Sequence, residues 1–243
     1  MFNLARVSLP IIFKDDRYGP LPVLLIVLTM VTGIVDAVSY LKLGHVFVAN
    51  MTGNVVFLGF AIADPQNFSI PASLVAIGAF LVGALAGGRL GLIFGRHRGL
   101  HITIAVIIES VLVGVTLIAS MATIDPNGAP TGYALIALLA FTMGLQNATA
   151  RRIGIPDLTT TVLTLTITGL AADSNLAGAN NPHLWRRSAS ITAMFLGAAL
   201  GAISVYHFGV SAALAFALVA LAGAGTAAYW HSSSSEAWSA DTR

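Results

Sequence analysis

The sequence from Gly33 to Asp64 reads GIVDAVSYLKLGHVFVANMTGNVVFLGFAIAD. The end of one apolar helix, which carries the acid Asp36, is followed by a second apolar run that is short and rich in polar residues. A bilayer core about 30 Å thick needs roughly 20 apolar residues per helix. The stretch therefore predicts a membrane helix followed by a segment that breaks inside the bilayer.

Composition points to the membrane for the rest of the chain. Of the 243 residues, 56% are hydrophobic and only 9% are charged, whereas a soluble domain has about 25% charged residues. This balance excludes an ordinary cytosolic enzyme, a disordered chain and a nucleic-acid binder. The sequence has no cysteine, which excludes disulfides, zinc–thiolate sites and thiol nucleophiles.

The pattern predicts an all-α, polytopic membrane helix bundle. We expect a cytoplasmic N-terminal segment at 1–20, a single membrane domain at 21–230 and a polar, disordered tail at 231–243. The membrane domain contains eight apolar segments, at 21–41, 45–63, 70–95, 101–122, 131–150, 157–174, 187–207 and 210–230.

The loop charges favour six net crossings. If all eight segments cross, six basic loop residues lie inside and five outside. If 45–63 and 157–174 each enter and leave on one side, ten lie inside, and only Lys42 lies outside. The positive-inside rule prefers the second arrangement, with both termini in the cytoplasm.

The sequence also contains an internal repeat. The stretch 144–173, GLQNATARRIGIPDLTTTVLTLTITGLAAD, aligns with 33–64 so that Gly33 matches Gly144 and Asp36 matches Asn147. The repeat halves are about 20–122 and 131–230. Three net crossings per half is an odd number, so the halves are expected to be inverted, as in many transporters. The alternative is a chance likeness between apolar segments rich in Gly and Ala.

The block TGIVDAVSYLKLGHVFVANMTGN at 32–54, together with 143–173, resembles the YoaK family of bacterial integral membrane proteins. The likeness covers about residues 20–230. It implies a multi-pass protein of the bacterial inner membrane, and it supplies no substrate, reaction or site residue.

Two acids inside the crossings are candidate ion- or proton-binding groups, since a charge buried in the membrane needs a partner or a watery cavity. Asp36 is either a coupling carboxylate or a structural acid that pairs with Arg or caps a re-entrant helix. Glu109, near the bilayer centre, is either a proton carrier or a hydrogen-bonded contact between helices. Arg89, near a segment end, is expected to snorkel to the interface.

Other polar residues gather at the two breaks and on the helices before them. Amides and hydroxyls there can cap a broken helix and also face a solute. Thr in membrane helices often bonds its own chain instead. The candidates for solute or ion binding are Tyr40, Asn50, Thr52, Asn54, Gln146, Asn147, Thr160, Thr161 and Thr164. Pro156 and Asp157 are expected to begin the second short helix.

Glycines at every fourth position predict close helix packing, either within the bundle or across a homodimer. They are Gly83, Gly87, Gly91, Gly197 and Gly201.

The hypothesis ranked first is a small-solute transporter or permease, proton- or cation-coupled through an intramembrane carboxylate. A passive channel with two re-entrant half-helices comes second, and a non-transport membrane partner protein third. The sequence lacks the converging acid, base or metal groups of an enzyme, and we expect no catalytic residue, metal or cofactor. The expected partners are the lipid bilayer, an unidentified small solute and a second copy of the chain.

Overall fold

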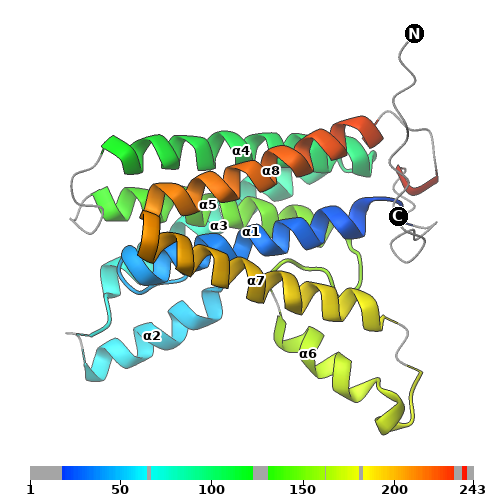
Figure 1. Ribbon diagram of the computed structural model, residues 1–243, viewed down its shortest axis with the longest axis horizontal. Helices are drawn as coiled ribbons and strands as arrows, with labels where there is room; N and C mark the ends of the chain where they lie inside the picture. Colours follow the sequence, from blue (N-terminus) through cyan, green and yellow to red (C-terminus); the bar gives the residue numbers. More distant parts are fainter. Residues whose placement is uncertain are drawn as a thin grey trace.

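The structure is a computed structural model that describes residues 18–64, 67–122, 131–161, 163–180, 183–232 and 237–239. Within these ranges the chain is helical and contains no β-strand, which confirms the all-α prediction. The α-helices are α1 (Leu21–Lys42), α2 (Met51–Ala63), α3 (Ile70–Phe94), α4 (Arg98–Ala122), α5 (Thr131–Ile153), α6 (Leu163–Ala172), α7 (Leu184–Phe208) and α8 (Val210–Ser232) (Figure 1).

Among the described residues, six helices are long and apolar enough to cross a membrane: α1, α3, α4, α5, α7 and α8. Their ends lie within three residues of the predicted segments. Figure 1 shows that α1 and α5 run in opposite directions along the long axis, as do α3 and α7, and α4 and α8. The chain is therefore a polytopic helical membrane bundle.

The two short helices begin six residues later than the apolar runs predicted, at Met51 and at Leu163. The described residues just before each short helix are not helical, because the chain turns through left-handed backbone at Gly44 and His45, and again at Gly154, Asp157 and Thr160. Both α2 and α6 begin near the middle of the molecule and run outward to opposite ends (Figure 1).

Glycines bring α1 and α7 into backbone contact. A Cβ on Gly33 would lie 2.5 Å from the carbonyl oxygen of Met194, and one on Gly197 would overlap the carbonyl oxygen of Met30. Any larger residue at these positions would push the helix axes apart. Gly201 lies in the same contact, against Ile34.

The contact between α3 and α5 has the same construction. A Cβ on Gly83 would overlap the carbonyl oxygen of Phe141, and one on Gly144 would overlap that of Phe80. In both contacts each glycine faces the residue three positions before the opposing glycine. Gly87 and Gly91 continue the α3 stripe, against Leu145 and against the Arg152 side chain. All five predicted packing glycines therefore make their close contacts within the bundle of a single chain.

The described part of the C-terminal tail is helical. Helix α8 continues to Ser232, and residues 237–239 form a 3-10 turn. The Trp238 side chain in that turn is buried, and a Cβ on Gly19 would lie 2.6 Å from its ring. The absence of a side chain on Gly19 leaves room for the Trp238 indole to pack there. The remaining tail residues and 1–17 lie outside the described residues.

Candidate solute site

Asp36 holds the loop that precedes α2. One carboxylate oxygen accepts hydrogen bonds from the backbone N–H groups of Val48, at 3.0 Å, and Ala49, at 2.9 Å. The other accepts from the side-chain amide of Asn50, the last residue before α2. These three donors satisfy the hydrogen-bonding capacity of a buried carboxylate. The arrangement favours the structural role for Asp36, that of an acid that caps a re-entrant helix.

Asn54 fixes the same loop from inside α2. Its side-chain oxygen accepts from the N–H of Phe47 at 2.9 Å, and its amide donates to the carbonyl oxygen of Phe47 at 2.6 Å. Asn54 is fully buried, so this paired contact replaces backbone hydrogen bonds that a break in a membrane helix would otherwise lose. Thr52, on the opposite side of α2, is exposed.

Asn147 on α5 makes the equivalent bond in the second half. Its side-chain amide donates to the hydroxyl of Thr161 at 2.7 Å. Asp36 and Asn147 are separated by 111 positions, as are Asn50 and Thr161, so the two junctions between a long helix and the short helix after it contain a bond at the same spacing. Thr160 is buried, and its hydroxyl has no hydrogen-bond partner in the part of the chain that the structure describes. Thr164 is exposed on α6.

An ion-pair cluster that the sequence analysis missed holds α6 against α7. The buried Arg187 guanidinium lies 3.1 Å from a carboxylate oxygen of Asp157 and 2.7 Å from one of Asp173, and it donates to the carbonyl oxygen of Gly169 at 2.6 Å. The expectation that Pro156 and Asp157 begin α6 is wrong, because Asp157 has φ 66° and pairs with Arg187 instead. The sequence signal was the two acids that flank α6, but only the fold brings them to one arginine.

Glu109 lies in the middle of α4 and is fully buried. Among the described residues, neither of its carboxyl oxygens has a hydrogen-bond partner. Leaving a buried polar group without a partner costs about 1–3 kcal/mol, and more for a charged group. The alternative role of Glu109, a hydrogen-bonded contact between helices, is therefore absent from the described part of the chain. The carboxyl remains available to an ion, a proton or water.

Gln146 and Asn147 are neighbours that serve different contacts. The Gln146 amide donates to the hydroxyl of Thr32 at 2.9 Å and to the carbonyl oxygen of Leu28 at 3.4 Å, linking α5 to α1. The Gln146 side-chain oxygen is buried and has no hydrogen-bond partner among the residues that the structure describes. The structure thus places Gln146 in the bundle interior and Asn147 at the junction with α6.

Tyr40, four residues beyond Asp36, lies among aromatic rings. Its ring stacks on that of Phe47 with centroids 5.1 Å apart, and the His45 ring meets its edge at 5.4 Å. The chain of rings continues through Phe57 to Phe68. This end of the first half is therefore apolar and aromatic.

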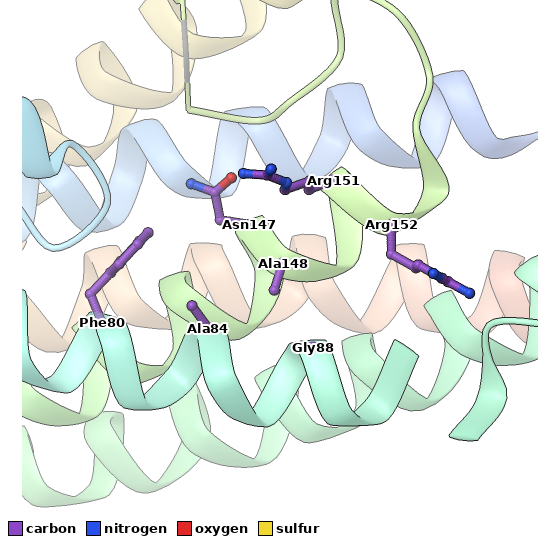
Figure 2. Close-up of a pocket in the computed structure, with 7 residues that line it drawn as sticks. All are labelled: Phe80, Ala84, Gly88, Asn147, Ala148, Arg151 and Arg152. Atoms are coloured by element: carbon purple, nitrogen blue, oxygen red, sulfur yellow. The ribbon is translucent and has the colours of Figure 1, made fainter. Parts of the chain in front are cut away.

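A cavity of about 690 Å³ lies between α3 and α5, and Asn147 is part of its lining. Figure 2 shows Phe80, Ala84 and Gly88 of α3 on one side and residues of α5 on the other. The polar residues that line it are Asn147, Arg151 and Arg152, and the Asn147 and Arg151 side chains point to the same side of α5 (Figure 2). The charge pattern of the sequence identifies both arginines only as topology signals and does not predict a cavity.

Six apolar helices with two short helices define a multi-pass helical membrane protein. The chain belongs to the family described as "Protein of unknown function (DUF1275)", whose model matches residues 24–227. It is 34% identical over 154 residues to the UPF0700 transmembrane protein YoaK of Bacillus subtilis (strain 168). That match covers 62% of this chain and 65% of the relative, slightly less than two thirds of its length. These findings confirm the resemblance to the YoaK family. No solved structure matches the chain.

Proposed function

We propose that this protein is a small-solute transporter of the bacterial inner membrane, built from two inverted halves, with both termini in the cytoplasm. The observation that carries the proposal is the pair of matched junctions, Asp36–Asn50 and Asn147–Thr161, each of which holds a short helix that begins at mid-depth. Non-helical backbone at membrane depth is tolerated where it is buried in protein or lines a watery cavity. Transporters place their sites at such broken helices.

The inverted relation has independent support from helix packing. The contact of α1 with α7 and that of α3 with α5 use glycines and opposing carbonyls at matching positions. Each contact joins a helix of one half to a helix of the other, and the matched helices run in opposite directions (Figure 1). A chance likeness of apolar segments gives no reason for such agreement.

Glu109 is the proposed coupling group. A transported proton needs a carboxyl that is accessible in turn to each side and not permanently engaged in structure. Asp36 already has three hydrogen-bond donors, whereas within the described ranges neither oxygen of Glu109 has one. We therefore assign proton coupling to Glu109 and a structural role to Asp36.

Reconstitution of the full chain in liposomes tests this function. A pH-sensitive dye inside the vesicles reports proton entry while separate panels of carboxylates, inorganic phosphate, amines, amino acids and sugars are added outside. We expect one class to enter with protons and to accumulate against its own gradient when the outside is acidic. If no class moves faster than in protein-free vesicles, the transport proposal is overturned.

Two variants separate a coupled transporter from a passive channel. Glu109→Gln should abolish uphill accumulation while downhill entry persists, and Asp64→Asn, which removes an acid in the α2–α3 connection, should leave both unchanged. A channel would give downhill entry only, with no response to Glu109→Gln. No enzymatic turnover, cofactor or metal enters this proposal, and a homodimer is proposed only as a unit that could complete the path.

A further inference from the structure

We propose that the cavity between α3 and α5 binds a phosphate or carboxylate group through Arg151, Asn147 and Arg152, and that this group belongs to the solute. The assignment of this group to the solute rests on the proposed transport function. The anionic group can come from a soluble solute or from a lipid head group, because both present the same oxygens to the cavity.

The charge of the lining favours an anion. Its only charged members, Arg151 and Arg152, are positive, and Asn147 adds a neutral amide. Within the described residues, Arg151 makes no ion pair. The two nearest acids in the chain sequence, Asp157 and Asp173, are already held by Arg187. No carboxylate therefore occupies the guanidinium that faces this cavity.

Comparison of the two halves gives the second argument. Asn147 corresponds to Asp36 and Arg151 corresponds to Tyr40, both at a separation of 111 positions. Asp36 demonstrates that an acid can build the junction, since it bonds Asn50 as Asn147 bonds Thr161. On the α5 side of the cavity, an amide therefore stands where α1 has the acid, and a guanidinium stands where α1 has the phenol. Both differences make the surroundings of Asn147 and Arg151 more positive than those of Asp36 and Tyr40. The bond between the long helix and the chain before the short helix requires neither difference.

The chemistry and size fit a small anionic molecule. A guanidinium binds carboxylate or phosphate through two parallel hydrogen bonds, and an amide adds a further donor. The volume of about 690 Å³ falls within the range of roughly 300–1,000 Å³ typical of small-molecule sites. Phe80 and Ala84 provide an apolar wall for the rest of the molecule.

Binding measurements on the purified full chain test the site. Inorganic phosphate and succinate are titrated calorimetrically at constant ionic strength in a neutral detergent. In parallel, native mass spectrometry counts phosphatidylglycerol retained from mixed phosphatidylglycerol–phosphatidylcholine nanodiscs. The variants are Arg151→Gln and Asn147→Asp, and the control is Arg96→Gln, which removes an exposed arginine between α3 and α4 at the same end of the bundle.

We expect phosphate or succinate to bind saturably, at least ten-fold more weakly in both site variants and unchanged in Arg96→Gln. Asn147→Asp keeps an acceptor for Thr161, so its effect reports charge and not unfolding. If the variants affect only phosphatidylglycerol retention, the group is a lipid head group, and the solute assignment is overturned. If neither ligand responds to Arg151 or Asn147, the whole inference is overturned. Uphill transport of a cation or sugar with no anion binding would overturn the site while the transport function stands.

Discussion

Exchange of the two side chains in the Asp36–Asn50 pair tests the structural role of Asp36. In Asp36→Asn, the new side-chain oxygen still accepts from Val48 and Ala49, but its amide nitrogen meets the Asn50 amide, donor against donor. Losing this bond at a buried site should cost about 1–3 kcal/mol. Asn50→Asp places two carboxylates face to face and should cost at least as much. The double variant restores one donor and one acceptor, so it should recover most of the loss.

For a chain of this size, about 1 kcal/mol corresponds to roughly 2–4 °C in unfolding temperature. Size-exclusion of heated, detergent-solubilised protein should therefore show a fall of several degrees in each single variant and recovery in the double. The control is the same exchange at the exposed Asp64–Asn67 pair, where the amide of Asn67 lies 2.7 Å from the Asp64 carboxylate, and where exposure to water should make the exchange nearly neutral. A double variant no more stable than its weaker single parent would refute the assignment.

Three further predictions concern packing, the ion-pair cluster and the buried acid. Gly83→Ala should lower the free energy of unfolding by about 1–3 kcal/mol, because its Cβ would overlap a backbone carbonyl, whereas Gly78→Ala meets open space and should be neutral in the same melting assay. Arg187→Gln should lower the free energy of unfolding by about 3 kcal/mol, because Asp157 stays largely buried without its partner. Hydrogen–deuterium exchange should rise in α6, and unchanged exchange there would contradict the role of the ion-pair cluster in holding α6 against α7. Glu109→Leu should raise the unfolding temperature and remove proton coupling, since it deletes an orphaned polar group, and Glu109→Gln should lose coupling without gaining stability; a less stable leucine variant would indicate a partner for the acid.

Hydropathy and charge were enough to predict the long helices. Runs of more than 20 apolar residues cannot be hidden in a small soluble core, so α1, α3, α4, α5, α7 and α8 follow from length alone. The starts of α2 and α6 did not follow. The break before α2 depends on Asp36 and Asn54, whose side-chain oxygens accept hydrogen bonds from the backbone N–H groups of Val48 and Phe47, and hydropathy does not report such contacts.

The candidate residues were recognised as polar groups in the membrane, but their roles needed three dimensions. Asp36 and Glu109 look alike in sequence, since each is an acid in an apolar segment. In the described structure, Asp36 accepts three hydrogen bonds and Glu109 accepts none. Arg151 was read as a topology signal because a basic residue at a helix end usually reports orientation. Its cavity forms only where α3 and α5 pack through glycine.

Accessibility of single cysteines in intact cells tests the inverted halves most directly, since the natural chain has no cysteine to remove. The positions are Asp64 after α2, Asn180 after α6 and Ser232 at the end of α8. With an impermeant thiol reagent, we expect labelling at 64 in intact cells and labelling at 180 and 232 only after permeabilisation. Labelling of 64 and 180 from the same side would contradict the inversion, and the transport proposal would lose the observation that carries it.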